Sequence, residues 1–462
     1  MKHLIYFFLF LLPGLVSAQQ YLSKSFPLEY QWQNIGNAGF SAGGAWYTSL
    51  AFSPVDGQPY VAFWDYGNSG LATVMKFNGT TWVNVGTPGF SAGGPLYLNL
   101  VFSPAGQPYV AYQDLGNSSK ATVMKFDGNN WVNVGTPGFS AGFATHTSLA
   151  FSPSGEPYVA YTDWANSIRC TVMKYDGNNW VNVGMPAFSA GEVDFTCISF
   201  SPSGQPFVAF QDVPLNGRAS VMKFDSINWV FVGIPGFSVQ AAYEESLAFG
   251  QSDEPYVAFQ DYSNSQKATV MKFDGTNWVN VGDAGFSKDT ADFICLRFNP
   301  SGVPYVAFED WGNSRRATVM KFNVTNWVNV GTDGFSEGWA WHTSLAFNPS
   351  NEQPCVAFQD NNHAQKATVM IYDSVISGIN DTKELKFILQ PNPVANYLTI
   401  YFKDVNSNFK FIEIYDLRGE KIFESETNKN RVNINVENYS NGIYSVKVNN
   451  NTSISISKFI KN

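Results

Sequence analysis

Seven tryptophans recur at an almost constant interval along most of the chain. Successive members are 50, 49, 49, 49, 49 and 49 residues apart: Trp32, Trp82, Trp131, Trp180, Trp229, Trp278 and Trp327. The residues around them follow one consensus, in the order W-V-N-V-G, G-F-S-A-G, S-L-A-F-S-P, P-Y-V-A-F-Q-D and A-T-V-M-K-F-D-G. A repeat of this kind is one supersecondary unit, which buries its apolar faces by packing against neighbouring copies. The chain is therefore expected to fold as an array of similar units.

Each unit contains four short runs of residues that favour β-strands. In the first copy these runs are 49–52, 60–64, 72–77 and 82–85, rich in Val, Phe, Tyr, Thr and Trp. Turn-forming Pro, Gly, Asn and Asp separate the runs, as at 201–206. Four strands in a repeat of about 45 residues are typical of a β-propeller blade. We therefore predict an all-β fold with a seven-bladed β-propeller; an array of β-sandwiches is the alternative.

The two ends of the repeat region complement each other. The region opens at residues 31–36 with the fourth strand of a unit and closes at residues 367–373 with the third. The opening strand can therefore complete the last sheet, which closes the ring and protects a free strand edge. This assigns residues 19–373 to the propeller.

The first 18 residues have the pattern of a secretory signal peptide. Lys2 and His3 precede an apolar run over 4–16, and the small residues Ser17 and Ala18 follow it. The mature chain is expected to begin at Gln19. No later run reaches the roughly 20 apolar residues of a membrane-spanning helix, so no transmembrane segment is predicted in the mature chain.

The composition excludes two broad classes. Only 14% of residues are charged and 16% are aromatic, whereas disordered chains combine low hydrophobicity with high charge. The net charge of −9 argues against a nucleic-acid partner, which needs a basic face.

The last part of the chain is a different domain. The repeat stops after 373, residues 374–384 form a predicted linker, and 385–462 contain predicted strands at 397–402, 411–415, 431–435, 443–448 and 453–459. The motifs of this part are Q-P-N-P from Gln390, I-Y-D-L-R-G-E-K from Ile414, N-G-I-Y-S-V from Asn441 and a final K-F-I-K from Lys458.

This tail resembles the C-terminal sorting domain of the type IX secretion system of Bacteroidetes. The resemblance implies a small β-sandwich, recognition by that secretion machinery, passage across the outer membrane, and release or surface attachment. An ordinary β-sandwich appended for binding is the alternative.

The four cysteines, Cys170, Cys197, Cys295 and Cys355, are predicted to be core residues and not disulfides. Cys170 stands at an Ala position of the repeat and Cys355 at a Tyr or Phe position, which suits a small apolar side chain. No Cys or His spacing typical of zinc is present, and no metal or cofactor is predicted.

An acidic residue ends the second strand of every copy, and a basic residue begins the third in six of the seven. These are Asp65, Asp114, Asp163, Asp212, Asp261, Asp310 and Asp360, with Lys120, Arg169, Arg218, Lys267, Arg316 and Lys366; Leu71 is the exception. Opposite charges on the two stems of a hairpin pair across strands, so a structural salt bridge is one interpretation. A hydrogen bond from the loop serine (Ser41, Ser91, Ser140 and equivalents) to the Asp would tie blade to blade, as in WD-type propellers. A ring of sugar-binding contacts is the other interpretation.

The copies differ most at the two residues that open the first strand. These pairs are Trp46-Tyr47, Leu96-Tyr97, Thr145-His146, Asp194-Phe195, Tyr243-Glu244, Asp292-Phe293 and Trp341-His342. We expect them to ring the channel mouth, because a packing position would not vary from Trp to Asp. Aromatic rings beside hydrogen-bonding groups suit carbohydrate. The predicted ligand-binding residues are Trp46, Tyr47, Tyr97, His146, Asp194, Tyr243, Glu244, Asp292, Trp341 and His342.

The sequence therefore favours an exported, non-catalytic, lectin-like propeller whose partners are a glycan and the secretion machinery. Two alternatives remain. Mouth carboxylates (Glu192, Asp194, Glu244, Glu245 and Asp292) and His146 or His342 could serve a polysaccharide-degrading enzyme, or the face could bind another protein. The same carboxylates could instead bind Ca²⁺. No residue is assigned a catalytic role.

Overall fold

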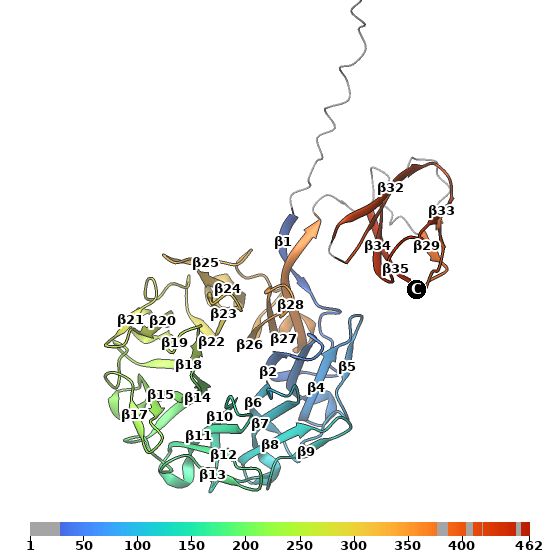
Figure 1. Cartoon of the computed structure of the whole chain (residues 1–462). Helices are drawn as coiled ribbons and strands as arrows, with labels where there is room; N and C mark the ends of the chain where they lie inside the picture. The colour runs from blue at the N-terminus through green and yellow to red at the C-terminus, as the bar shows by residue number, and fades with distance from the viewer. Residues whose placement is uncertain (1–27, 377–386, 403–409, 418, 450–453) are drawn as a thin grey trace, which may run out of the picture. The chain divides into compact units, whose positions relative to one another are not determined.

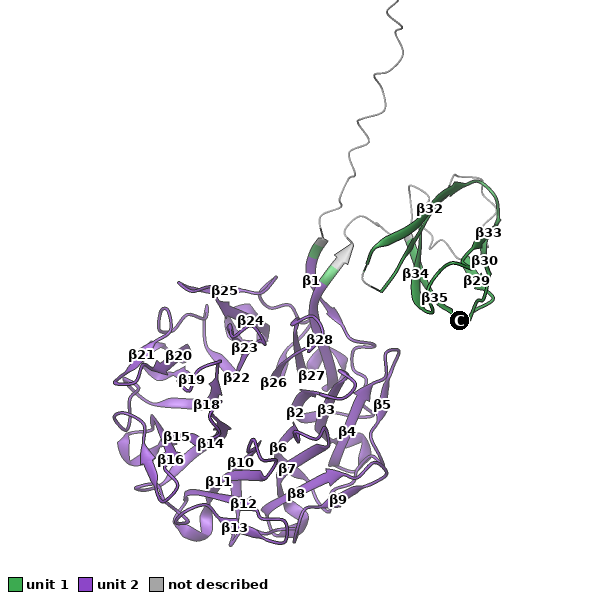
Figure 2. Ribbon diagram, viewed as in Figure 1, with its two compact units in different colours: residues 1–29, 374–462 green, residues 30–373 purple. Residues whose placement is uncertain are grey.

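Strands and short turns make up nearly all of the chain that can be described. The computed structural model describes residues 28–376, 387–402, 410–417, 419–449 and 454–462. The predicted signal peptide, 1–18, lies outside these residues. The chain divides into two compact units: residues 30–373, and residues 374–462 together with 1–29 (Figure 2).

Residues 30–373 form seven four-stranded antiparallel sheets arranged as blades around an axis (Figure 1). The innermost strands are β2 (Ala45–Phe52), β6 (Pro95–Phe102), β10 (Ala144–Phe151), β14 (Val193–Phe200), β18 (Ala242–Phe249), β22 (Ala291–Phe298) and β26 (Ala340–Phe347). The second strands are β3 (Pro59–Asp65), β7 (Pro108–Asp114), β11 (Pro157–Asp163), β15 (Pro206–Asp212), β19 (Pro255–Asp261), β23 (Pro304–Asp310) and β27 (Pro354–Asp360).

The outer half of each blade has a longer third strand and a short fourth strand. The third strands are β4 (Leu71–Phe77), β8 (Lys120–Phe126), β12 (Arg169–Tyr175), β16 (Arg218–Phe224), β20 (Lys267–Phe273), β24 (Arg316–Phe322) and β28 (Lys366–Ile376). The fourth strands are β5 (Trp82–Asn84), β9 (Trp131–Asn133), β13 (Trp180–Asn182), β17 (Trp229–Phe231), β21 (Trp278–Asn280), β25 (Trp327–Asn329) and, for the seventh blade, β1 (Leu28–Asn34).

A single-turn 3-10 helix joins the second strand to the third in every blade. These helices are η1 (Tyr66–Asn68), η2 (Leu115–Asn117), η3 (Trp164–Asn166), η4 (Val213–Leu215), η5 (Tyr262–Asn264), η6 (Trp311–Asn313) and η7 (Asn361–His363).

The hydrophobic core lies between blades and not within one sheet. Every residue of β7 is buried, because each face of the second strand packs against a neighbouring blade. One cluster, for example, combines Tyr109 and Ala111 of the second blade with Val159 and Tyr161 of the third. Burial on both faces explains why the repeat reads P-Y-V-A-F instead of alternating apolar and polar residues.

The recurring tryptophan ties each blade to the one before it. Trp131 Nε1 donates to the Val85 carbonyl at 2.8 Å, and its ring stacks on Phe90 with centroids 4.4 Å apart. Trp32 makes the same bond to the Val330 carbonyl at 2.8 Å. Because Trp32 lies on β1 of the seventh blade and Val330 follows β25 of the sixth, this bond ties the N-terminal strand to the sixth blade.

The fold class predicted from the repeat is confirmed, and the boundaries differ in one informative way. The innermost strand of the first blade begins at Ala45, four residues before the apolar run that the sequence shows. The strand register shifts between Trp46 and Ser49, so a β-bulge breaks the alternation from which a strand start is predicted.

The tail is a small β-sandwich, as predicted. Its strands are β29 (Phe387–Gln390), β30 (Tyr397–Phe402), β31 (Lys410–Tyr415), β32 (Lys421–Thr427), β33 (Arg431–Asn435), β34 (Gly442–Asn449) and β35 (Ile454–Lys461). They form the sheets β29-β30-β33 and β32-β31-β34-β35, which share one core that includes Leu398, Ile412 and Val446. Strands β29 and β32 are not evident in the sequence, since both are short of buried residues.

All four cysteines are free thiols, and Cys170, Cys295 and Cys355 are buried. Cys170 and Cys355 occupy inter-blade cores, as their repeat positions predict. In the described part of the chain, no helix has the length and apolar character needed to span a bilayer.

Candidate functional site: the inner ring and the rim of the propeller

A β-bulge near the start of every innermost strand places one side chain in the central channel. The second residue of each variable pair has a left-handed backbone, with φ from 49° to 57°: Tyr47, Tyr97, His146, Phe195, Glu244, Phe293 and His342. This region is unfavourable for bulky residues and costs about 1–3 kcal/mol each. The surrounding sheet therefore imposes the same strained conformation seven times.

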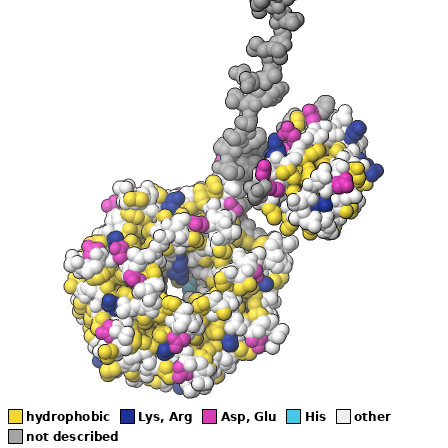
Figure 3. Space-filling view, viewed as in Figure 1, with side chains coloured by type: hydrophobic (Ala, Val, Ile, Leu, Met, Phe, Trp, Pro, Cys, Tyr) yellow, Lys and Arg dark blue, Asp and Glu magenta, His cyan; other side chains and the backbone are white. Residues whose placement is uncertain are grey.

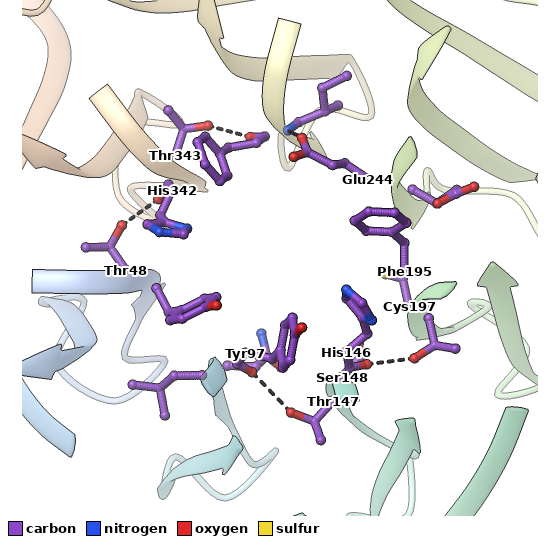
Figure 4. Close-up of a pocket in the computed structure, with 17 residues that line it drawn as sticks. Thr48, Tyr97, His146, Thr147, Ser148, Phe195, Cys197, Glu244, His342 and Thr343 are labelled. Carbon is purple, nitrogen blue, oxygen red and sulfur yellow. Dashed lines mark hydrogen bonds between the residues drawn. The ribbon is translucent and has the colours of Figure 1, made fainter. Parts of the chain in front are cut away.

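These seven residues, which we call the inner ring, point into a central cavity of about 420 Å³ (Figure 4). The space-filling view shows the hollow at the centre of the propeller (Figure 3). Neighbouring rings are in contact: the centroids of Tyr97 and His146 are 4.3 Å apart, and those of Phe293 and His342 are 4.5 Å apart. The cavity wall is thus a belt of six aromatic rings interrupted by the carboxyl group of Glu244.

In four of the seven copies the residue after the inner-ring position is a threonine that fastens neighbouring blades: Thr48, Thr147, Thr196 and Thr343. Thr147 Oγ1 donates to the Tyr97 carbonyl at 3.1 Å, and Thr343 Oγ1 donates to the Phe293 carbonyl at 2.6 Å. In the fifth blade this position is Glu245, whose buried carboxyl oxygens have no hydrogen-bond partner. Burial raises the pKa of Glu245 well above its usual range, because the charged form is penalised away from water.

Two ionisable groups of the inner ring, Glu244 and His342, have pKa values shifted toward their neutral forms. Burial, with a smaller contribution from the charge of Asp292, raises the pKa of Glu244 to about 8. Burial lowers the pKa of His342 to about 4. The inner ring therefore presents aromatic and hydrogen-bonding groups to the cavity, with the neutral forms of Glu244 and His342 favoured.

Glu244→Gln is expected to stabilise the protein at pH 8.5 and to change its stability little at pH 4. The pKa of Glu244 in the fold, about 8, exceeds its ordinary value of 4.5, so the folded state binds the proton more tightly than the unfolded state. Stability from this group is present below pH 4.5 and is lost as the pH rises through 8. Melting temperatures of both proteins at the two pH values test this, and an equal difference at both would contradict it.

The first residues of the variable pairs do not line the cavity. They lie further out, against the single-turn helices: the rings of Trp46 and Tyr66 are 6.2 Å apart, and Trp311 Nε1 donates to Asp292 Oδ2 at 2.8 Å. Trp164 Nε1 likewise donates to Thr145 Oγ1 at 3.1 Å. The predicted mouth therefore separates into the inner ring, with Tyr47, Tyr97, His146, Glu244 and His342, and an outer tier with Trp46, Asp194, Tyr243, Asp292 and Trp341. The two tiers touch at Asp194, whose Oδ1 lies 2.7 Å from His146 Nδ1.

The first residue of each single-turn helix was missed in the sequence. Six of the seven are large apolar side chains that are between 39% and 53% exposed: Tyr66, Leu115, Trp164, Val213, Tyr262 and Trp311. Together with the outer tier they form what we call the rim. The sequence did carry a signal for these residues, because this position varies from copy to copy as the two residues that open the first strand do.

The predicted salt bridge between the repeat Asp and the basic residue is wrong. Asp114 and Lys120 do face each other across the strands, but Asp114 is fully buried and accepts from Gly116 N, Asn117 Nδ2 and Thr122 Oγ1 at 2.7–3.0 Å. The carboxylate is saturated by donors of its own blade, and the ammonium group stays solvated.

The other copies are buried in the same way and also lack the ion pair, although Asp310 Oδ1 has no hydrogen-bond partner among the described residues. Asp65, Asp114, Asp163, Asp212, Asp261, Asp310 and Asp360 are at most 4% exposed, and in the described residues none forms an ion pair with Lys120, Arg169, Arg218, Lys267, Arg316 or Lys366. Buried and internally bonded, these carboxylates are not free to bind sugar hydroxyls.

The predicted bond from the loop serine to the Asp is also wrong. Ser91 Oγ accepts from Ala72 N at 2.8 Å and donates to the Gly93 carbonyl at 2.7 Å. The serine therefore fixes the loop against the third strand, and it does not reach the carboxylate. No group of three or more His, Cys, Asp or Glu side chains suited to a metal ion is found among the described residues.

The tail has a direct counterpart among known families. Residues 389–462 match the family described as the secretion system C-terminal sorting domain. The tail is therefore a type IX sorting domain, and it directs the chain to the cell surface or out of the cell. No curated protein matches the chain.

Solved structures share the propeller fold at low identity. PorZ, a surface component of the type IX secretion system of Porphyromonas gingivalis, is 13% identical with a TM-score of 0.48, over 92% of this chain and 61% of that one. The extracellular domain of a hybrid two-component system from B. thetaiotaomicron is 11% identical with a TM-score of 0.52, over 94% and 59%. SapL1 lectin, solved with alpha methyl fucoside, is 16% identical with a TM-score of 0.41, over 64% and 97%. At these identities the likeness concerns the fold alone.

Proposed function

We propose that this exported propeller binds carbohydrate through the face formed by the inner ring and the rim. The observation that carries the proposal is the placement of part-exposed aromatic rings directly beside hydrogen-bonding groups. Trp46 alone lies within about 6 Å of the rings of Tyr66, Trp341 and His342. Such rings cover the apolar C–H face of a sugar, and fixed polar groups orient its hydroxyls.

The rigidity of the face supports the same function. Each inner-ring residue lies in a bulge between two paired stretches of its strand. In four blades its carbonyl also accepts a hydrogen bond from a threonine of the next blade, such as Thr343 to the Phe293 carbonyl. A ligand therefore meets side chains that are already ordered, which lowers the entropic cost of binding weakly interacting groups such as hydroxyls. The partners in this proposal are a glycan at the propeller and, through the tail, the secretion machinery.

One observation favours a second candidate, a glycoside hydrolase. A carboxyl group that is protonated at pH 7 is the state a general acid needs, and Glu244, with a pKa of about 8, is in that state beside Asp292. Both oxygens of Asp292 already accept hydrogen bonds, from Gln260 and from Trp311, which leaves it poorly placed as the partner nucleophile. Release of reducing ends from a bound polysaccharide, abolished in Glu244→Gln, would favour the enzyme.

The full mature chain is expected to bind a subset of the glycans on an array. The double variant Trp46→Ala with Trp341→Ala is expected to bind those glycans at least about tenfold more weakly, which is a loss of about 1.4 kcal/mol in binding free energy. Val324→Ala serves as a control, because this residue is 88% exposed and lies in the turn between β24 and β25, away from the inner ring and the rim. Absence of binding to any glycan would overturn the proposal, and binding to proteins of the same surface instead would favour an adhesion module.

A further inference from the structure

The repeat makes each blade a control for the others, and one junction departs from the pattern at several positions together. Fifth and seventh blades carry Gln at two equivalent sites, Gln260 with Gln266 and Gln359 with Gln365, whereas the sixth blade carries Glu309 with Arg315. Trp339, just before β26, stands where the other copies have Gly44, Gly94, Phe143, Glu192, Ala241 and Thr290. These departures meet between the sixth and seventh blades.

At this junction the guanidinium of Arg315 is enclosed by three indole rings. Its Cζ lies 4.6 Å from the centroid of Trp311, 4.9 Å from that of Trp339 and 5.6 Å from that of Trp341. Its Nε donates to Oε1 of Glu309 at 2.7 Å, and the Glu309 side chain is fully buried. Cation–π contacts and the buried ion pair thus fix the guanidinium in one orientation.

The cluster leaves binding groups unused. Trp311 is 46% exposed and Trp339 is 41% exposed, and in the described structure Nη1 of Arg315 makes no hydrogen bond, since only Nε and Nη2 bond to Glu309. A cluster built only for stability would bury its indole rings. Here two part-exposed indole rings lie beside a fixed fork of N–H donors, and such groups can stack on a sugar ring and bind its hydroxyls.

The charges around Arg315 favour a neutral sugar. Glu309 is bonded to it, and Asp292 is bonded to Trp311, the indole closest to it. Two carboxyl groups beside one guanidinium repel a carboxylate or sulfate on a ligand. A sugar hydroxyl is not repelled, because it can accept a hydrogen bond from the guanidinium and donate one to a carboxylate. The aromatic rim of the other blades has no such cation: Trp164 in the third blade is 50% exposed and is followed at the Arg315 position by Ile168.

We propose that the junction of the sixth and seventh blades is the dominant saccharide subsite of the propeller, one per chain, in which Trp311 and Trp339 stack on a neutral sugar ring and Arg315 donates to its hydroxyls. The proposal rests on the carbohydrate-binding function above and adds the location, the stoichiometry and the ligand class.

Affinity electrophoresis of the full mature chain tests it, with gels that contain laminarin, arabinan, xyloglucan or mannan as neutral probes and alginate or polygalacturonate as acidic ones. Glu309→Gln with Arg315→Gln gives the sixth blade the residues that the fifth and seventh already carry, so the fold has a template for the change. We expect this variant and Trp339→Ala to bind the retarding neutral polysaccharide at least tenfold more weakly. Val324→Ala, which lies away from the inner ring and the rim, is expected to stay within twofold of the unaltered chain. Trp164→Ala, which removes a rim indole that has no cation beside it, is expected to lose clearly less affinity than Trp339→Ala.

Titration calorimetry with an oligosaccharide of that polysaccharide is expected to give one site per chain. Equal losses in Trp164→Ala and Trp339→Ala, or a stoichiometry near seven, would overturn the single-subsite proposal and leave the carbohydrate-binding function intact. Retardation by the acidic gels alone would overturn the ligand class. No retardation by any probe, together with an empty glycan array, would instead remove the proposed function itself.

Discussion

Asp114→Ala is expected to lower the free energy of unfolding by about 3 kcal/mol, and Lys120→Ala to change it by less than about 0.5 kcal/mol. The carboxylate accepts from Gly116 N, Asn117 Nδ2 and Thr122 Oγ1 in a fully buried position. Alanine leaves these donors without a partner, and each buried unsatisfied group costs about 1–3 kcal/mol, reduced here where water can enter the loop. Lys120 is only partly buried and forms no ion pair in the described structure, so little stabilisation is lost with its side chain.

Denaturant unfolding of the two variants, followed by circular dichroism, measures both effects. Asp114→Asn is the matched intermediate, since its amide oxygen still accepts from one or two of the donors, and it is expected to fall between Asp114→Ala and the unaltered protein. If Lys120→Ala were as destabilising as Asp114→Ala, the cross-strand ion pair would be restored as the explanation for the conserved spacing of the two residues in the repeat.

This comparison shows where reasoning from the sequence stops. The repeat places Asp114 and Lys120 opposite each other, and the strands do pair them. The sequence does not show how many neutral donors the loop supplies, because that depends on the single-turn helix and on the rotamer of Thr122. The Asp114 carboxylate bonds to the nearer neutral donors, and the Lys120 ammonium group stays in solvent. The strand register was therefore predicted correctly, but the ion pair inferred from it was wrong.

The fold was predictable because the sequence repeats the same structural information seven times. Seven copies of one unit, each with the same tryptophan, specify strands, turns and blade number together, and the mismatched ends specify closure. The site was only half predictable. Variation among the copies identified the positions of the inner ring and the outer tier. Left-handed backbone, however, usually carries Gly or Asn, and the inner ring carries Tyr, His, Phe and Glu. These residue types do not predict the β-bulge that separates the inner ring from the outer tier.

The cluster around Arg315 was hidden for a different reason. Its members come from three segments, 309–315, 339 and 341, and each looks like one more irregular copy when read along the chain. Only the packing of two adjacent blades brings them together. The rim residues such as Trp164 illustrate the same limit, since their importance follows from exposure and from contact with the outer tier, neither of which the sequence records.

Trp32→Ala is expected to lower the free energy of unfolding by about 3 kcal/mol, at the lower end of the range for a large aromatic residue because Trp32 is only partly buried. The ring stacks on Phe335 with centroids 3.9 Å apart, and Nε1 donates to the Val330 carbonyl. Trp32 is the only copy of the recurring tryptophan that lies on a strand supplied from the other end of the propeller, so its loss weakens the closure as well as one blade interface.

The consequence of weak closure differs from that of an ordinary core cavity. When β1 detaches, β28 becomes an open edge that can pair with another chain, so we expect Trp32→Ala to form soluble aggregates on mild heating. Trp131→Ala removes the equivalent ring from a blade whose four strands are contiguous, and it is expected to be at least as destabilising without early aggregation. Tyr30→Ala, at an exposed position of the same strand, serves as the control. Calorimetry combined with light scattering measures the stability and the aggregation of each variant. Equal aggregation of Trp32→Ala and Trp131→Ala at equal loss of stability would show that the blade completed by β1 is no weaker than the six blades built from contiguous strands.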